Sequence, residues 1–192
     1  MGAVPNQKAE KSACYAGIDA QNKHPVTVFC GKFLMMNILF VCLGNICRSP
    51  LAEAIFLHKI EEKGLADVYK ASSCGTSNYH IGDPPDPRTI RNALKNGIEI
   101  HHVCRQISYA DLENFDLVLP MDKNNYVTIL NLKGASLQAH KIVLMRQYDT
   151  QGKGEDVPDP YSGTERDFQE VFEILDRSID GLIGHLRTTK NT

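Results

Sequence analysis

The segment with the clearest capacity for chemistry is Cys42–Pro50, which reads Cys-Leu-Gly-Asn-Ile-Cys-Arg-Ser-Pro. A loop that turns into a helix directs successive backbone N–H groups at one centre, and the helix dipole adds positive potential there. Arg48 can hold two oxygens of a phosphate with its planar fork. The same positive surroundings favour the thiolate form of a cysteine placed like Cys42. The segment therefore predicts an anion-binding site that carries its own nucleophile.

The other residues of this segment have types that suit a tight loop around an anion. Gly44 and Asn45 both accept a positive φ, which such a loop demands. Ser49 can donate a hydroxyl hydrogen bond to the thiolate and ease its departure from phosphorus. A nucleotide-binding loop is excluded, because neither of the glycine-rich nucleotide motifs occurs at this junction. The predicted phosphate-binding loop comprises Leu43, Gly44, Asn45, Ile46, Cys47 and Arg48.

A phosphate ester also needs an acid at its leaving oxygen, and Asp159-Pro160-Tyr161 is the best candidate to supply it. Protonation by a carboxylic acid allows an aryloxide or alkoxide to depart. Pro158 and Pro160 stiffen the backbone on both sides of Asp159. Tyr161 offers an aromatic wall for a substrate ring. An ordinary Asp-Pro turn is the alternative, so the tripeptide gains weight only together with the cysteine loop.

Strand and helix signals alternate around these residues. Strands are expected at 38–41, 68–72, 117–121 and 142–144, each a short apolar run typical of a buried strand. Helices are expected at 51–63, 88–96, 123–132 and 165–186, with Ser49, Asp122 and Thr164 as N-caps and Pro50 as the first helical residue. Gly64 and Gly97 end two of the helices. The pattern predicts a single α/β domain with a four-stranded parallel sheet and helices on both faces, and ligands bind such sheets beyond the carboxyl ends of the strands.

The composition is that of an ordinary globular protein. The chain of 192 residues is long enough for one domain with a sizeable core. Its 21 basic and 23 acidic residues leave a net charge of −2. Such a balance gives no electrostatic case for nucleic acid or an anionic membrane as a partner.

The cysteines favour a reducing compartment. A secreted disulfide scaffold would be smaller and denser in cysteine than this chain, which has six. Zinc is an alternative, with Cys42, Cys47, His101 and His102 as candidate ligands. The two cysteines are more widely spaced than in usual zinc pairs, and no second pair exists. We therefore expect reduced thiols and no zinc site.

Residues 1–35 are predicted to be a poorly ordered N-terminal extension of a domain that spans residues 36–190, because residues 1–25 are polar and lack an apolar period. The apolar stretch Val26–Leu43 is the alternative, as a signal peptide or lipid anchor. Lys32 and Asn37 interrupt it, however, and its last third suits a strand. No span is long enough for a membrane helix. A cytoplasmic location is expected, with secretion as the alternative.

The loop from Val41 to Pro50 and the later Asp159-Pro160-Tyr161 closely resemble the two motifs of the low-molecular-weight protein-tyrosine phosphatases. The resemblance covers about residues 36–186, nearly the whole chain beyond the extension. It implies a four-stranded parallel sheet and a reaction without a cofactor. Cys42 would be the nucleophile, Arg48 the phosphate clamp and Asp159 the general acid and then the base. The substrates would be phosphotyrosine proteins or small aryl phosphates.

The resemblance also assigns supporting positions. Ser73 stands at the position whose side chain, in members of the family, hydrogen-bonds the loop asparagine, here Asn45. His102, Arg105 and Asp122 resemble structural positions. Ser162 stands where some members carry a second tyrosine, so the chain departs from a paired-tyrosine pattern there.

Other activities occur within this fold, and the sequence bears on each. An arsenate reductase needs resolving cysteines, and none follows Cys104. Phosphoarginine phosphatases tend to have threonine at the position of Ile46 and no aromatic residue after Asp-Pro, whereas Ile46 and Tyr161 here favour contact with a flat aromatic ring. A redox-sensing module is a further alternative, because Cys47 lies close enough in sequence to Cys42 for a protective disulfide.

Overall fold

The structure is a computed structural model that describes residues 35–132 and 134–189. The predicted N-terminal extension and the alternative of a signal peptide therefore lie, apart from Met35 and the residues of the first strand, outside the described residues.

A parallel sheet forms the centre of the described part of the chain. Strand β1 (Met36–Cys42) pairs with β2 (Tyr69–Gly75) on one side and with β3 (Leu117–Pro120) on the other, in the order β2-β1-β3. The central position of β1 explains its composition, because Ile38–Val41 are fully buried between the two layers of helices. The predicted buried strand at 38–41 is confirmed, and the other two strands lie within a few residues of their predicted positions.

The prediction of a fourth strand is wrong for the described residues. Ile142 forms only an isolated parallel bridge with Val118, supported by a hydrogen bond of 3.0 Å from the amide of Val143 to the carbonyl oxygen of Val118. The chain is in 3-10 helix directly before this point (Ala135–Lys141) and again at Met145–Tyr148. Too few extended residues remain between these two helices to continue the ladder. The sheet accordingly has three strands.

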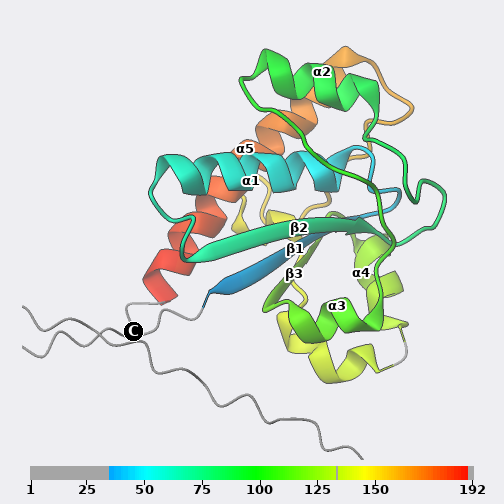
Figure 1. Cartoon of the computed structure of the whole chain (residues 1–192), viewed down its shortest axis with the longest axis vertical. Coiled ribbons are helices and arrows are strands. Elements are labelled where there is room, and N and C mark those ends of the chain that lie inside the picture. Colours follow the sequence, from blue (N-terminus) through cyan, green and yellow to red (C-terminus); the bar gives the residue numbers. More distant parts are fainter. Residues whose placement is uncertain (1–34, 133, 190–192) are drawn as a thin grey trace, which may run out of the picture. The chain divides into compact units, whose positions relative to one another are not determined.

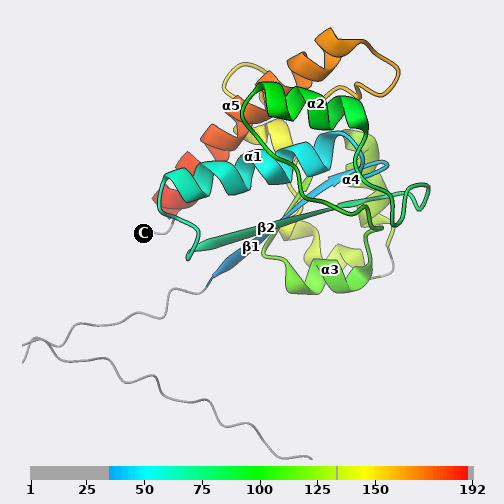
Figure 2. The same ribbon diagram turned by 45° about the horizontal axis from the view of Figure 1, so that its top comes forward.

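Helices cover both faces of the sheet, as predicted (Figures 1 and 2). Helices α1 (Arg48–Glu62), α2 (Pro87–Lys95) and α5 (Glu165–Thr189) lie on one face. Helices α3 (Tyr109–Asn114) and α4 (Lys123–Leu130) lie on the other. Successive residues of β1 supply the two cores: Ile38 and Phe40 pack towards α1 and α5, while Leu39 and Val41 pack towards α3 and α4.

Four of the predicted helix ends agree with the structure, including Thr164 directly before α5, and the start at Ser49 and Pro50 does not. Gly64, with a φ of 65°, follows the end of α1, and Gly97, with a φ of 79°, follows α2. Asp122 caps α4 by accepting a hydrogen bond from the amide of Asn125. Ser49, however, is not an N-cap, because α1 already begins at Arg48 and the Ser49 hydroxyl faces Cys42 instead.

Helix α3 was absent from the prediction, although the sequence carries a signal for it. Ser108 and Asp111 form a capping box, in which the Asp111 carboxylate accepts hydrogen bonds from the backbone amide of Ser108 at 2.7 Å and from its hydroxyl at 2.9 Å. Six residues are too few to show an apolar period. Only the capping residues could have indicated this helix.

Candidate active site

The predicted phosphate loop lies at the carboxyl end of β1. Cys42 is the last residue of this strand and Arg48 is the first residue of α1, so the loop connects the central strand directly to a helix N-terminus. A cavity of about 360 Å³ opens above it. The residues that line the cavity are Cys42, Leu43, Gly44, Ile46, Cys47, Arg48, Tyr79, His80, Asp159 and Tyr161. Two segments predicted separately from the sequence thus meet at one site.

The sulfur of Cys42 is surrounded by hydrogen-bonding groups. Its Sγ lies 3.1 Å from the hydroxyl oxygen of Ser49 and accepts a hydrogen bond of 3.2 Å from the backbone amide of Asn45. Ser49 is fully buried and Cys42 nearly so. Groups of this kind stabilise negative charge on sulfur.

Asn45 fixes the shape of the loop, although it does not line the cavity. It has a φ of 58°, the left-handed conformation that asparagine tolerates better than most residues. Its amide nitrogen donates to Ser49 Oγ at 2.9 Å and to Ser73 Oγ at 3.0 Å. Its amide oxygen accepts from the backbone N–H of Arg105 at 3.0 Å and lies 2.8 Å from His102 Nε2. The buried side chain therefore ties the loop to the end of β2 and to the segment that follows α2.

Glu53 of α1 completes this network. Its carboxylate accepts a hydrogen bond of 2.7 Å from Ser73 and lies 3.2 Å from His102 Nδ1. Ser73 and His102 thus each contact both Asn45 and Glu53, and the hydrogen bond from Asn45 to Ser73 is the one that the family resemblance implies.

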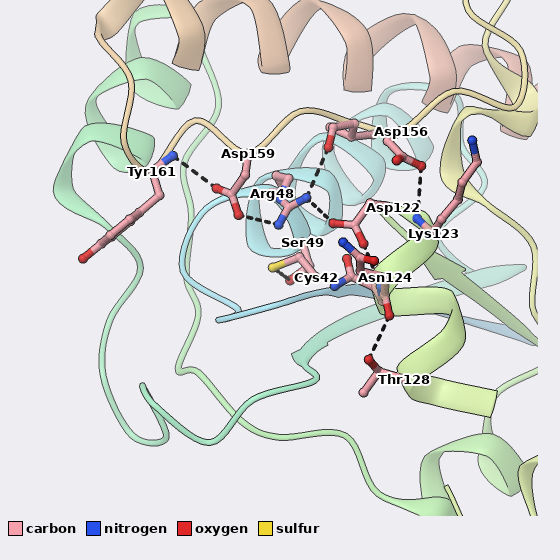
Figure 3. A network of polar contacts seen from close by, with 12 residues as sticks. Cys42, Arg48, Ser49, Asp122, Lys123, Asn124, Thr128, Asp156, Asp159 and Tyr161 are labelled. Atoms are coloured by element: carbon pink, nitrogen blue, oxygen red, sulfur yellow. Dashed lines mark hydrogen bonds and ion pairs between the residues drawn. The ribbon is translucent and has the colours of Figure 1, made fainter. Parts of the chain in front are cut away.

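Arg48 is buried and its two terminal nitrogens are paired with two carboxylates. Nη1 donates to Asp122 at 2.6 Å and to the carbonyl oxygen of Val157 at 3.2 Å, while Nη2 donates to Asp159 at 2.5 Å. Figure 3 shows the guanidinium between these two carboxylates, next to Cys42 and Ser49. Burial would lower the pKa of Arg48, but the neighbouring Cys42, Asp159 and Asp122 raise it. Arg48 is consequently a permanent positive charge at the floor of the cavity.

Asp159 and Tyr161 come from one loop (Figure 3), and both line the cavity. The amide of Val157 donates to the carbonyl oxygen of Met121 at 2.8 Å, which fixes this loop to the end of β3. Asp159 in turn accepts a hydrogen bond of 3.1 Å from the backbone amide of Tyr161. The side chain of Asp159 is 43% exposed, and Tyr161 is 53% exposed. Both can meet a molecule that enters from solvent.

The other thiols near the loop differ from Cys42 in their surroundings. Burial raises the pKa of Cys47 to about 12, and burial together with the neighbouring Cys42 raises that of Cys104 to about 11. Burial also raises the pKa of Cys74. These three side chains are therefore neutral thiols at neutral pH.

Two residues of the cavity wall, Tyr79 and His80, were not predicted from the sequence. His80 packs closely over the loop, because a Cβ on Gly44 would lie 3.3 Å from its ring. Both residues follow β2 in an irregular segment, and no spacing or motif marks them. They become part of the site only through the pairing of β2 with β1.

The zinc site considered from the sequence does not form among the described residues. His101 lies by Glu99 at the surface, and His102 is engaged with Asn45 and Glu53. Within residues 35–132 and 134–189, no three His, Cys, Asp or Glu side chains are arranged to hold a metal ion.

In the part of the chain that the structure describes, no helix is both long enough and apolar enough to span a bilayer.

The fold and the site together define a class of protein: an α/β protein with a thiol and a guanidinium in the loop that joins the central strand of a parallel sheet to a helix N-terminus. The family model of low molecular weight phosphotyrosine protein phosphatases matches residues 37–192. The chain belongs to this family.

Relatives of known sequence and structure agree with this assignment. A low molecular weight phosphotyrosine protein phosphatase of Schizosaccharomyces pombe is 41% identical over 145 residues, which is 74% of this chain and 92% of that protein. The crystal structure of a protein tyrosine phosphatase from Entamoeba histolytica is 37% identical, has a TM-score of 0.77 and covers 81% of this chain and 99% of its own. The arginine phosphatase YwlE is more distant, with 28% identity, a TM-score of 0.70 and coverage of 79% of this chain and 96% of its own.

Proposed function

We propose that this protein hydrolyses phosphotyrosine, and small aryl phosphates, through a phosphocysteine intermediate. The observation that carries the proposal is that Cys42, Arg48 and Asp159 line one cavity, although they come from two distant parts of the chain. Membership of the family supports the same activity.

In the first proposed step the Cys42 thiolate attacks phosphorus while the bond from phosphorus to the ester oxygen breaks. Asp159 gives its proton to the departing oxygen, so a neutral phenol leaves. Arg48 and the backbone amides of the loop hold the phosphoryl oxygens as charge moves onto them.

In the second step Asp159, now a carboxylate, removes a proton from water, and the water oxygen attacks phosphorus. The bond from sulfur to phosphorus breaks, which releases inorganic phosphate and the Cys42 thiolate. The Ser49 hydroxyl, 3.1 Å from Cys42 Sγ, can donate a hydrogen bond to this leaving sulfur. Neither step requires a cofactor.

The walls of the cavity support an aromatic substrate. Ile46, Tyr79 and Tyr161 all line it, so a flat ring attached to the phosphate would meet apolar and aromatic surfaces. Phosphoarginine is the alternative substrate, because the chain is also similar to the arginine phosphatase YwlE. The aromatic walls favour phosphotyrosine.

Since the chemistry needs a reduced Cys42, we propose that the protein acts in a reducing compartment, the cytoplasm.

The central test of the mechanism is the variant Cys42→Ser. Hydrolysis of para-nitrophenyl phosphate should fall to the background level, because the serine hydroxyl is a much weaker nucleophile than a thiolate. The wild type should keep its activity in a metal chelator. Activity that survives in Cys42→Ser, or that disappears from the wild type with the chelator, would contradict the mechanism.

A second measurement decides the substrate. We expect kcat/KM to be higher for a phosphotyrosine peptide than for a phosphoarginine peptide of the same sequence. A preference for phosphoarginine would leave the mechanism intact but would overturn the roles given to Ile46 and Tyr161.

A further inference from the structure

Tyr161, one of the proposed ring walls, stands on an exposed loop. A side chain that is 53% exposed can occupy several rotamers unless a neighbour restricts it. The neighbour that reaches its ring is Arg88 of α2, whose guanidinium carbon lies 5.4 Å from the ring centroid. At this distance a guanidinium is attracted to the face of a tyrosine ring.

Arg88 is itself held in a fixed orientation. Its Nε and Nη2 donate to the two carboxylate oxygens of Asp86, at 3.0 and 2.7 Å. Its guanidinium carbon also lies 4.8 Å from the ring centroid of Phe168, a buried residue of α5. Helix α2 packs against α5 (Figures 1 and 2), so the contact between Arg88 and Phe168 joins two helices that already touch. A bidentate pair with a stacked aromatic ring is a geometry that arginine, unlike lysine, can adopt.

Asp86 in turn is fastened to the phosphate loop. Its backbone amide donates to the carbonyl oxygen of Ile46 at 2.9 Å. Asp86 is also the N-cap of α2, accepting from the backbone amide of Arg88 at 2.8 Å. A continuous series of contacts therefore runs from Ile46, through Asp86 and Arg88, to Tyr161. Its two ends are the residues expected to face the two sides of a substrate ring.

We propose that Arg88, oriented by Asp86, is a positioning residue that holds Tyr161 at a fixed separation from Ile46 and so adapts the cavity to an aromatic phosphate ester. The proposal rests on the proposed function. It assigns to α2 a role in substrate selection, although no residue of α2 lines the cavity with the phosphate loop.

The carboxylate that orients Arg88 stays charged under acidic assay conditions. The hydrogen bonds from Arg88 lower the pKa of Asp86 below its ordinary value. The contact should therefore persist at the mildly acidic pH at which phosphatases of this chemistry are assayed.

The test compares Arg88→Ala with Arg91→Ala. Arg91 is an exposed arginine one turn further along α2, so the control removes the same charge from the same helix. We expect Arg88→Ala to raise KM for para-nitrophenyl phosphate and for a phosphotyrosine peptide about three- to tenfold, with a smaller change in kcat. The inhibition constant of inorganic phosphate should not change, because phosphate lacks a ring. Arg91→Ala should match the wild type in all three measurements.

Two further variants separate positioning from folding. Asp86→Asn keeps a residue that caps helices well and removes the charge that orients Arg88, so it should reproduce part of the rise in KM. In a Tyr161→Leu background, Arg88→Ala should add no further increase, because the ring that it positions is gone. Equal effects of Arg88→Ala in both backgrounds, or an equal effect of Arg91→Ala, would overturn the proposal. If the proposed function itself were wrong, the wild type would fail to hydrolyse the phosphotyrosine peptide, which is a different result.

Discussion

Arg48 is 3% exposed and carries a charge that burial makes costly unless it is balanced. Asp122 and Asp159 balance it from two different loops. The pair with Asp159 also brings this carboxylate to the cavity that contains Cys42. One buried cation thus orients the group proposed to act as the acid.

The role of Asp159 can be tested through the leaving group. Asp159→Ala should lower kcat by about 10²- to 10⁴-fold for phenyl phosphate, whose leaving group needs a proton. The loss should be much smaller for an ester of a strongly acidic phenol. The measurement is kcat for a series of aryl phosphates, and the slope against the leaving-group pKa should become steeper in the variant. An equal loss for every ester would assign Asp159 a structural role only.

The positions of the candidate site residues were easier to predict from the sequence than their contacts. The cysteine, the arginine and the loop glycine and asparagine lie in one uninterrupted segment, so their spacing alone indicated an anion site. Tyr79 and His80 join the cavity only because β2 pairs with β1. The pair between Arg88 and Tyr161 depends on the packing of α2, which no local pattern specifies.

At the scale of elements, the end of β2 acts as a support for the phosphate loop. A Cβ on Gly75 would lie 2.7 Å from the carbonyl oxygen of Leu43 and 3.1 Å from the carbonyl carbon of Gly44. Both are backbone atoms, so the loop would have to move to accept any side chain. The absence of a side chain at Gly75 lets the loop pack directly on the strand.

Gly75→Ala should therefore damage activity more than stability. A displaced loop misplaces the thiol relative to the phosphate, and we expect kcat/KM to fall by about tenfold to a hundredfold. The matched control is Gly184→Ala in α5, where a Cβ meets nothing within 4 Å. That variant should keep full activity and gain about 0.5–1 kcal/mol of stability in urea unfolding. Normal activity in Gly75→Ala would show that the loop can adjust freely.

The positions of the elements were largely predictable from apolar period and capping residues, and the errors have local causes. The segment at 142–144 has the composition of a strand, but the 3-10 helices on both sides leave it too short to pair beyond one bridge. The N-cap assigned to Ser49 failed because its hydroxyl hydrogen-bonds in the active-site network instead. Competition of this kind is visible only in three dimensions.

At the scale of the whole molecule, a buried charge cluster connects the last helix to the rest of the domain. Asp149 follows the 3-10 helix at Met145–Tyr148, and its fully buried carboxylate pairs with Arg146 and with Arg177 of α5. Burial alone would raise the pKa of Asp149, but hydrogen bonds from Arg177, the amide of Gln151 and Arg146 lower it to about 2. The carboxylate of Asp149 therefore binds a proton less readily in the folded protein than in the unfolded chain.

Stability should accordingly decrease on acidification. Since the pKa of Asp149 is lower in the folded state, its contribution is complete above about pH 4 and is lost as the pH falls towards 2. The contribution amounts to about 2 kcal/mol. Urea unfolding at several pH values should show that Asp149→Asn is less stable than the wild type at pH 6. Between pH 4 and pH 2, the free energy of unfolding of this variant should decrease less than that of the wild type. Glu170→Gln, at an exposed position of α5, is the control and should follow the wild type. A variant curve parallel to that of the wild type would exclude Asp149 as the cause.

Arg48 and Asp159 are 111 residues apart in the chain, yet they form one ion pair. During synthesis β1, the loop and α1 leave the ribosome before β3, and the Asp159 loop and α5 follow after β3. A nascent chain thus contains Cys42 well before it contains Asp159, the residue proposed as the general acid. We therefore expect no hydrolysis of aryl phosphates by nascent chains from which residue 159 has not yet emerged.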